Sequence, residues 1–317
     1  MPPKILLAPN MQPEVQATVR PHYTLYDLTG YATPGQVPGL EAKEIQGVVT
    51  RGESIFGADL MDALPNLEII SNFGVGYDGI DALAAKARGV MLTHTPNILT
   101  DETANTALVL ALDVTRRISE SDRFVRAGKW PTGEMPLATS IIGKTAGILG
   151  FGRIGRALAL RLEACGMGIA YSDVNRTDDV AHPYYPDPVG LASACDLLFV
   201  CCIGGAPTRD LVNAEVLAAL GPSGFLINAA RGSIVHEAAL VEALEKGTIA
   251  GAGIDVFADE PNVPPALLDM DNVVVLPHVG SSTIETRQRM ADLTLANLDR
   301  HFAGEPVLTP VPQMKDN

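Results

Sequence analysis

The stretch TAGILGFGRIG at residues 145–155 constrains the fold of this chain more than any other. Residues 146–149 are small and apolar, which predicts a short buried strand that ends at Gly150. Gly150, Gly152 and Gly155 form a G-x-G-x-x-G pattern, and apolar residues recur at helical spacing behind it. In such a turn the first glycine permits the tight bend, the second lets a pyrophosphate approach the backbone, and the third lets the helix pack on the strand. The first N–H groups of that helix would face a phosphate.

A G-x-G-x-x-G pattern alone is weak evidence of a dinucleotide site, because glycine-rich turns are common. The residues around it distinguish such a site from an ordinary turn. A further predicted strand, residues 168–172, follows the helix and ends at Asp173. An acid about 20 residues beyond the glycines is the group that binds the adenosine ribose in a dinucleotide site. The alternative is an ordinary strand–helix–strand unit without a ligand, and the context favours the dinucleotide site.

Asp173 also bears on the choice of cofactor. Its carboxylate would repel the 2′-phosphate of NADP, so the sequence favours NAD(H). Arg176 lies three residues further on and would partly compensate that repulsion, so NADP(H) stays open as an alternative.

Strands and helices are predicted to alternate along the chain. Short apolar runs predict strands at residues 4–8, 22–27, 47–50, 67–71, 90–93, 196–203, 224–228, 250–256 and 272–276. Alternation with short connections is typical of doubly wound parallel sheets. We therefore predict an α/β fold with two such domains, since 317 residues can bury two cores.

One predicted helix is unusually apolar. It runs from residue 101 to about 126, with Thr100 as a candidate N-cap, and carries mostly aliphatic side chains. A helix of this kind is buried against something large, such as another domain or a second subunit. The loop after it holds Trp130, the one tryptophan of the chain.

The charge and cysteine content exclude several classes of partner. The chain has 37 acidic and 23 basic residues and a formal net charge of −14, which argues against nucleic acid and anionic membranes. Its four cysteines lack the spacing of a disulfide framework or a zinc site, and no metal is expected. Cys201 and Cys202 are adjacent in a predicted strand and would be small core residues on opposite faces. The N-terminus lacks a signal-peptide layout, so we expect a cytoplasmic protein.

Three polar side chains lie where a doubly wound sheet binds its ligands, at the carboxyl ends of strands. Arg231 follows one strand and can form paired hydrogen bonds to a carboxylate. Glu260 precedes a proline, and His278 follows the last strand, where an imidazole can exchange a proton with a substrate. Each has a plainer alternative (an ion pair at a helix end, a turn cap, a core histidine), but their common placement favours a catalytic set. The other histidines are expected to be surface or packing residues: His22, His94, His182, His236 and His301.

Over nearly its full length the chain resembles the D-isomer-specific 2-hydroxyacid dehydrogenase family. The motifs that carry the resemblance are GFGRIG at 150–155, NAARG at 228–232, DVFADEP at 255–261 and PHVG at 277–280, supported by NFGVGYD at 72–78. Within the family, residues 202–209 and 252–261 are similar to the glyoxylate/hydroxypyruvate reductase branch. One departure is Ile203, where many members carry proline, so contacts with the cofactor are expected to differ there.

The resemblance implies a role for each candidate residue. His278 would be the acid/base at the substrate C2 oxygen, and Glu260 would orient it. Arg231 would bind the carboxylate and carbonyl of a 2-oxo acid, and the backbone N–H groups of Val75 and Gly76 would bind the carboxylate from the opposite domain. The residues expected to contact the cofactor are Thr103, Gly150, Gly152, Arg153, Ile154, Gly155, Asp173, Cys202, Thr208, Ala229, Asp255, His278 and Gly280.

The resemblance also implies how the domains are arranged. A Rossmann cofactor domain, residues 98–282, would be inserted into a flavodoxin-like substrate domain built from residues 1–97 and 283–317. The helix at 101–126 resembles the dimer-forming element of the family, which implies a homodimer. Trp130 would either enter the active site of a neighbouring subunit or pack between domains, and both alternatives stay open.

The resulting hypothesis is NAD(P)H-dependent reduction of small 2-oxo acids, such as glyoxylate and hydroxypyruvate, to D-2-hydroxy acids. A second hypothesis keeps the fold and changes the substrate to D-lactate, D-3-phosphoglycerate or phosphite. A third is a non-catalytic, nucleotide-sensing binding protein, against which the presence of Arg231, Glu260 and His278 counts.

Overall fold

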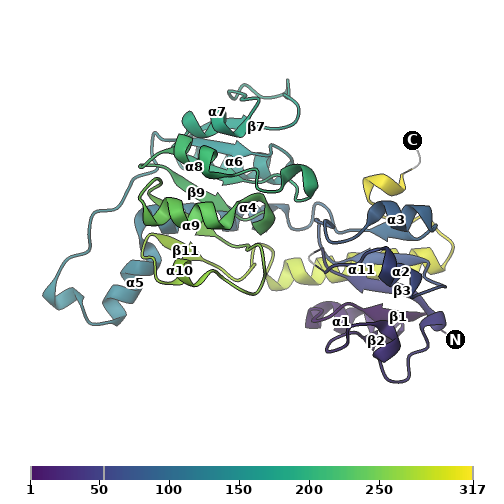
Figure 1. The fold of residues 1–317 in the computed structure, drawn as a ribbon. Coiled ribbons are helices and arrows are strands. Elements are labelled where there is room, and N and C mark those ends of the chain that lie inside the picture. Colours follow the sequence, from purple (N-terminus) through teal and green to yellow (C-terminus); the bar gives the residue numbers. More distant parts are fainter. Residues whose placement is uncertain (1, 53, 316–317) are drawn as a thin grey trace. The chain divides into compact units, whose positions relative to one another are not determined.

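The computed structural model describes residues 2–52 and 54–315, and the chain divides into two compact units. Unit 1 combines both ends of the chain, Met1–Leu99 and Ser281–Asn317, whereas unit 2 is continuous, Thr100–Gly280. In Figure 1 the purple, dark blue and yellow parts of the ribbon therefore belong to unit 1, and the teal to green parts make up most of unit 2. The assignment of a substrate role to one unit and a cofactor role to the other stays a prediction.

Unit 1 contains a parallel sheet in the order β2-β1-β3-β4-β5. Its strands are Lys4–Leu7 (β1), Thr24–Asp27 (β2), Ile45–Thr50 (β3), Ile69–Asn72 (β4) and Met91–Thr93 (β5). Its α-helices are Pro13–Val19 (α1), Ala58–Asp62 (α2), Ala82–Ala87 (α3) and Ile284–Phe302 (α11). The 2-1-3-4-5 order is that of flavodoxin-like folds, which confirms the predicted class of this sheet.

Helices cover both faces of this sheet because its strands are apolar on both sides. On one face Ile70 and Leu92 pack in a cluster with side chains of α2 and α3. On the other face α11 packs against α1 and β4, and the Ser71 hydroxyl donates a 3.2 Å hydrogen bond to the carbonyl of Thr294. The C-terminal helix is therefore an integral layer of a unit that begins at the N-terminus.

Unit 2 contains a second parallel sheet in the order β11-β10-β9-β8-β6-β7. Its strands are Thr145–Leu149 (β6), Gly168–Ser172 (β7), Leu197–Val200 (β8), Phe225–Asn228 (β9), Gly251–Ile254 (β10) and Val273–Val275 (β11). Its α-helices are Thr100–Arg116 (α4), Ile118–Arg126 (α5), Arg153–Ala164 (α6), Pro188–Ser193 (α7), Ala214–Leu220 (α8), Glu237–Glu245 (α9) and Pro265–Leu268 (α10).

The strand order of unit 2 reverses between β6 and β8. β7 lies on one side of β6, and a parallel bridge between Tyr171 and Tyr184 extends that side further, whereas all later strands lie on the other side of β6. Ligands of doubly wound sheets bind outside the carboxyl ends of the strands at such a reversal. The glycine pattern follows β6, so it lies at this point of the sheet.

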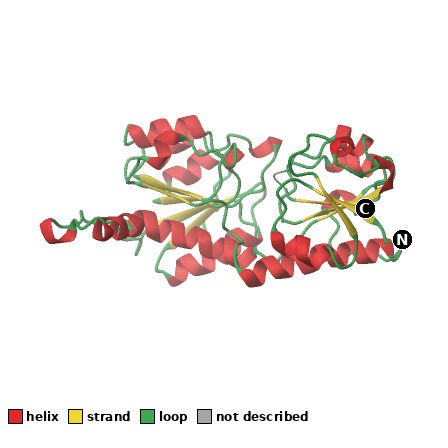
Figure 2. Ribbon diagram, turned by 90° about the horizontal axis from the view of Figure 1, so that it is seen from below, coloured by secondary structure: helices red, strands yellow, loops and turns green. Residues whose placement is uncertain are grey.

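Side-chain alternation along the strands of unit 2 builds a core on each face. Leu198 and Val200 of β8 pack with α7, α8 and α9, whereas Leu197 and Phe199 pack with α4 and α6. Figure 2 shows the strands of each unit with helices above and below them. Both sheets thus have the doubly wound α/β architecture predicted from the sequence.

The predicted single helix at 101–126 is wrong, because the structure has two helices that meet at Arg117. The φ angle of Arg117 is +55°, a left-handed conformation that ends α4. The Asp113 carboxylate then accepts hydrogen bonds from the N–H and the hydroxyl of Ser119, which fixes the start of α5. α4 buries one face against α6 and the sheet of its own unit, where burial against another domain or a second subunit was expected. No residue of α5 is buried, and α5 with the segment after it extends away from the sheet (Figures 1 and 2).

Two smaller features complete the fold. β8 ends at Val200, so Cys201 and Cys202 follow the strand instead of lying within it as predicted. Cys201 still packs with the cluster under α4 and α6, and Cys202 with the opposite cluster. None of the helices in the described part of the chain combines the length and apolar character needed to cross a membrane.

Candidate active site and dinucleotide turn

The turn after β6 has the backbone geometry that each of its glycines is expected to serve. Gly150 has a φ of +95°, and a Cβ there would lie 2.4 Å from the backbone nitrogen of Cys202. A Cβ on Gly155 would lie 2.3 Å from the carbonyl oxygen of Gly150, so a side chain would push α6 away from the turn. Beside Gly152, in contrast, no atom lies within 4 Å of such a Cβ, which leaves space against the backbone.

The start of α6 fits a bound phosphate. Gly152 is the N-cap and offers no side-chain acceptor, so the first N–H groups of this 12-residue helix have no capping side chain. The helix dipole and these N–H groups favour an anion at this position. The residues of the turn therefore fit the pyrophosphate of a dinucleotide.

Asp173 lies at the carboxyl end of β7, beside the turn. Its carboxylate accepts hydrogen bonds from the N–H of Phe151 and the N–H of Val174, each at 2.7 Å. Arg176, further along the same loop, is exposed to solvent. The predicted ribose-binding acid is thus next to the glycine turn, and a cation is close in sequence.

His278 and Glu260 form a pair in unit 2. The Nδ1 of His278 lies 2.7 Å from Oε2 of Glu260, and the N–H of Phe257 donates to the other carboxylate oxygen at 3.0 Å. Burial tends to raise the pKa of Glu260, but the hydrogen bond and charge of His278, the N–H of Phe257 and the charge of Arg231 together hold this pKa below its ordinary value. An ionised Glu260 in this place fixes the orientation of the imidazole and stabilises its protonated form.

Asp255 holds the backbone on either side of His278. Its carboxylate oxygens accept the N–H groups of Val279 at 2.7 Å and Gly280 at 2.8 Å, while its carbonyl accepts the N–H of His278. Burial raises the pKa of Asp255, and these two N–H groups and the His278 charge oppose the rise. The same contacts accompany the positive φ of His278, 54°, which is unusual for a residue other than glycine. Asp255 therefore sets the position of the catalytic candidate.

Arg231 is held at the end of β9 by its own segment. The side chain of Asn228 donates to the carbonyl of Arg231 at 2.9 Å and accepts the N–H of Ala230 at 3.1 Å. A Cβ on Gly232 would overlap the backbone of Phe257 at 1.9 Å, so the glycine allows this segment to pack against the one that leads to Glu260. The charge of Arg231 also helps to lower the pKa of Glu260.

The remaining predicted cofactor residues lie around the same edge of the sheet of unit 2. The Thr208 hydroxyl donates to the carbonyl of Ile203 at 2.7 Å, and Thr103 lies beneath Gly280, with its hydroxyl 3.8 Å from the position of a Cβ there. The other four are in the first turn of α6 or directly after β8 and β9: Arg153, Ile154, Cys202 and Ala229. Their roles toward a cofactor stay predictions.

Val75 and Gly76 lie in unit 1, in the loop that follows β4. His94, predicted to be a surface or packing residue, is a buried neighbour of this loop and packs against Tyr77. Because β5 ends at Thr93, His94 is in fact at a strand end, and its Nδ1 lies 3.0 Å from the carbonyl oxygen of Val75. The strand-end criterion that selected His278 would have selected His94 as well.

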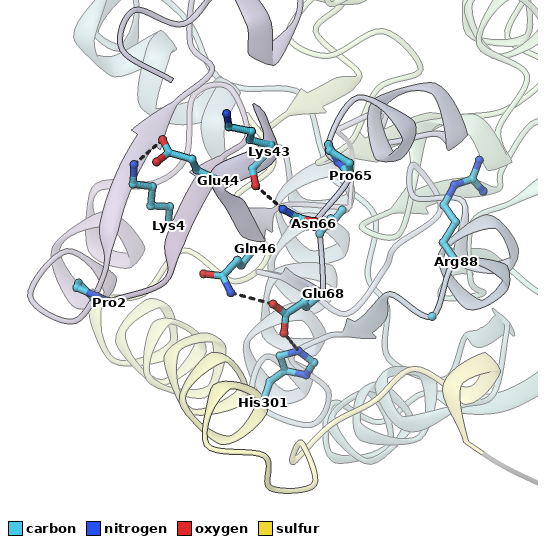
Figure 3. A pocket seen from close by; sticks show the side chains of 12 residues that line it. Pro2, Lys4, Lys43, Glu44, Gln46, Pro65, Asn66, Glu68, Arg88 and His301 are labelled. Atoms are coloured by element: carbon cyan, nitrogen blue, oxygen red, sulfur yellow. Dashed lines mark hydrogen bonds and ion pairs between the residues drawn. The ribbon is translucent and has the colours of Figure 1, made fainter. Parts of the chain in front are cut away.

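A separate hollow of about 710 Å³ lies at the amino ends of the strands of unit 1, the edge opposite this loop (Figure 3). Its polar side chains already have partners within the chain. Lys4 pairs with Glu44, and His301 lies 3.6 Å from Glu68, which also accepts a hydrogen bond from Gln46. Because ligands of parallel sheets bind at the carboxyl ends of strands, we attribute this hollow to a surface ion-pair network.

The fold and the site define an oxidoreductase that uses a nicotinamide dinucleotide. The model of the D-isomer specific 2-hydroxyacid dehydrogenase NAD-binding domain matches residues 108–280. A hydroxyphenylpyruvate reductase of Plectranthus scutellarioides is 48% identical over 272 residues, which cover 86% of this chain and 87% of the relative. A glyoxylate/hydroxypyruvate reductase of Arabidopsis thaliana is 48% identical over 267 residues, 84% of this chain and 85% of the relative.

A solved structure agrees with these relatives. The NADPH-dependent glyoxylate/hydroxypyruvate reductase of Sinorhizobium meliloti, in complex with NADP and malonate, is 44% identical and superposes with a TM-score of 0.93 over 99% of this chain and 98% of the other. The chain belongs to the D-isomer-specific 2-hydroxyacid dehydrogenase family and is similar to its glyoxylate/hydroxypyruvate reductases. The predicted preference for NAD over NADP is not supported, since the similar structure contains NADP.

Proposed function

We propose that this protein reduces small 2-oxo acids, glyoxylate and hydroxypyruvate among them, to D-2-hydroxy acids with NAD(P)H. The observation that carries the proposal is the pair of His278 and Glu260, 2.7 Å apart at the carboxyl end of the sheet that bears the dinucleotide turn. The relatives named for the same reaction support the choice of substrate class.

His278, Glu260 and Arg231 have different proposed roles in this reduction. The nicotinamide cofactor supplies the hydride when bound. His278 uses Nδ1 for Glu260, so Nε2 is the ring nitrogen that gives its proton to the C2 oxygen of the substrate. Glu260 stabilises the protonated imidazole before this transfer, and Arg231 binds the oxygens of the 2-oxo acid through its guanidinium.

The decisive assay is the loss of NADPH and NADH absorbance with a panel of acids. Glyoxylate, hydroxypyruvate, pyruvate, hydroxyphenylpyruvate and 2-ketogluconate should be compared at equal concentration. Rapid oxidation with glyoxylate or hydroxypyruvate is expected. Oxidation of D-lactate, D-3-phosphoglycerate or phosphite with NAD(P)+, seen as a gain of absorbance and without reduction of any 2-oxo acid, would replace the substrate class. Tight NADPH binding without turnover of any compound would favour the nucleotide-sensing alternative.

Both cofactors are proposed to bind, with Arg176 serving NADPH. The two oxygens of Asp173 already accept backbone N–H groups, and the exposed Arg176 is available for a 2′-phosphate. Arg176→Gln is therefore expected to lower kcat/KM with NADPH by about tenfold, the effect of losing one charge-assisted hydrogen bond. The same variant should stay within about twofold of wild type with NADH, which serves as the internal control. Equal losses with both cofactors would contradict this role.

A homodimer is proposed through α5 and the segment that follows it. Ile118, Val125, Trp130 and Leu137 are exposed although large and apolar, and Leu137 is 98% exposed. Several large apolar side chains exposed on a segment that extends away from its sheet indicate a surface that another copy covers. Light scattering should give a dimer mass for the wild type, and Leu137→Asp with Trp130→Ser should shift it toward the monomer. A wild-type monomer would refute the proposal.

A cytoplasmic location and the absence of nucleic-acid and membrane partners are proposed from the cysteines and the net charge. Four free cysteines suit the reducing cytoplasm, and the net charge of −14 disfavours nucleic acid and anionic membranes. Fractionation with an antibody to the chain tests the location directly.

A further inference from the structure

Donors from the ends of β4 and β5 bind three consecutive carbonyl groups of the loop after β4. The backbone N–H of Thr95 donates to the carbonyl of Gly74 at 2.9 Å. The Nδ1 of His94 lies 3.0 Å from the carbonyl of Val75, and the side-chain amide of Asn72 donates to the carbonyls of Gly74 and Gly76 at 3.0 and 2.9 Å. All these groups belong to unit 1, and the donors come from the ends of β4 and β5.

The protonation of His94 and the orientation of Asn72 follow from these acceptors. A carbonyl oxygen only accepts, so Nδ1 of His94 must carry a hydrogen. The Asn72 side chain is fully buried and faces two carbonyls, which fixes its NH₂ group toward them and leaves its Oδ1 without a partner among the described residues.

Fixing the carbonyls also fixes the N–H groups of the same peptide units. In a trans peptide the C=O and the following N–H point in opposite directions. Each of the N–H groups of Val75, Gly76 and Tyr77 therefore points away from the donor that binds the carbonyl of its own peptide unit. Among the described residues none accepts a hydrogen bond from these three N–H groups.

The surroundings of the loop suit an anion. A Cβ on Gly52 would lie 2.0 Å from the carbonyl oxygen of Gly76, so the loop is pressed against the backbone behind it and has little freedom to turn its peptides over. The guanidinium of Arg287 lies 5.6 Å from the centre of the Phe73 ring, which brings a positive charge to the same loop. Consecutive N–H groups beside a cation form an anion-binding concavity.

We propose that His94 is a positioning residue that makes this loop a carboxylate site by holding the Val75 carbonyl, with Asn72 in the same role for Gly74 and Gly76. The inference rests on the proposed function, because the carboxylate is that of the 2-oxo acid. It adds a reason for the predicted role of Val75 and Gly76, namely that side chains outside the loop direct their N–H groups.

The test compares three variants in steady-state kinetics with glyoxylate and NADPH. His94→Phe keeps a ring of similar size and removes the donor, so KM for glyoxylate should rise at least about tenfold while kcat and the Kd of NADPH stay within about threefold. His94→Asn places an amide donor near the position of Nδ1 and should restore KM to within about threefold of wild type. His301→Phe, the same substitution at the opposite edge of the sheet, is the control and should leave KM unchanged.

Several outcomes would overturn the inference. A normal KM in folded His94→Phe, or equal damage in His94→Asn and His94→Phe, would show that the hydrogen bond to Val75 does not position the loop. If His94→Phe fails to fold, Asn72→Ser removes the side-chain donor of the Gly76 carbonyl and one of the two donors of the Gly74 carbonyl, and it should produce the same rise in KM.

The result can be separated from the fate of the proposed function. If the wild type reduces no 2-oxo acid, the proposed function falls, and calorimetric titration of malonate then tests the loop alone. Binding to wild type that weakens at least about tenfold in His94→Phe supports the anion site. Equal binding to both proteins, or no binding to either, overturns it.

Discussion

The three glycines of the dinucleotide turn should respond differently to the same change, alanine. At Gly155 the new Cβ would lie 2.3 Å from the Gly150 oxygen and 3.1 Å from a methyl group of Ile148, so α6 or the turn must shift by roughly 1 Å. Overpacking of this kind costs about 1–3 kcal/mol, which lowers the melting temperature of a unit of this size by roughly 2–12 °C. At Gly152 the new Cβ meets nothing within 4 Å, and an alanine N-cap costs at most about 1 kcal/mol.

For NADPH binding we expect the opposite order, because Gly152→Ala should weaken it more than Gly155→Ala does. Wild-type protein with NADPH at about 100 times its Kd gains roughly 2.7 kcal/mol of stability. If the methyl group added in Gly152→Ala fills the space through which the pyrophosphate approaches, a Kd at least tenfold weaker leaves a gain of about 1.4 kcal/mol or less. The variant Gly152→Ala should therefore melt nearly like wild type without cofactor and lose about half or more of the stabilisation by NADPH.

Melting curves with and without NADPH, together with a fluorescence titration of the cofactor, measure both effects. Gly168→Ala is the matched control, because Gly168 lies at the amino end of β7 and its Cβ would make only an ordinary 3.9 Å contact. Full NADPH stabilisation in Gly152→Ala would refute the reasoning, since the open space beside Gly152 would then not be the path of the pyrophosphate. Unchanged melting of Gly155→Ala would show that α6 adapts without cost.

Four further changes test other parts of the site. His278→Ala should lower kcat by roughly 10²- to 10⁴-fold and leave the Kd of NADPH within about threefold, as judged by steady-state rates and titration; a wild-type rate would place the proton donor elsewhere. Arg231→Ala should raise KM for glyoxylate by roughly 10- to 150-fold, and unchanged kinetics would remove its assigned role. The pKa of Glu260 is depressed, so the ionised carboxylate stabilises the fold above its ordinary pKa of 4.5, and this stabilisation is lost as the pH falls below that value. Wild type should therefore melt about 2–4 °C above Glu260→Gln, the difference expected for a half-buried pair. This difference in melting temperature should disappear below about pH 4.5 and persist above it. Burial raises the pKa of Cys201 and of Cys202 to about 12, so iodoacetamide at pH 8 should leave NADPH binding intact, and rapid inactivation blocked by Cys202→Ala would contradict this.

Sequence patterns were sufficient for features that depend on local spacing and on the geometry of parallel sheets. The glycine turn, Asp173 and the pair of Glu260 and His278 all follow strands, and parallel strands bring their carboxyl ends to one edge. The same reasoning predicted both doubly wound sheets, because apolar runs and helical patterns alternate at the required lengths. The roles of the individual residues toward substrate and cofactor were inferred by resemblance and remain predictions.

Features that depend on a single backbone angle or on a distant contact were not predictable. The left-handed conformation of Arg117 breaks an otherwise continuous helical pattern, and the Asp113 contact that accompanies it spans the break. The contact of His94 with Val75 joins residues from two strand ends, and only the order of the strands makes them neighbours. No periodicity in the sequence marks either feature.

The division of unit 1 between the two ends of the chain has a consequence for synthesis. Unit 2 is continuous and can close both of its cores once residue 280 has left the ribosome. The sheet of unit 1 is made first, but α11, which covers one of its faces and includes the buried Met290 and Leu298, is made last. Until α11 has been made, the apolar face of β4 and its neighbours stays uncovered. The first third of the chain therefore completes its fold only after the last tenth has been synthesised. During that interval the nascent chain needs protection from aggregation.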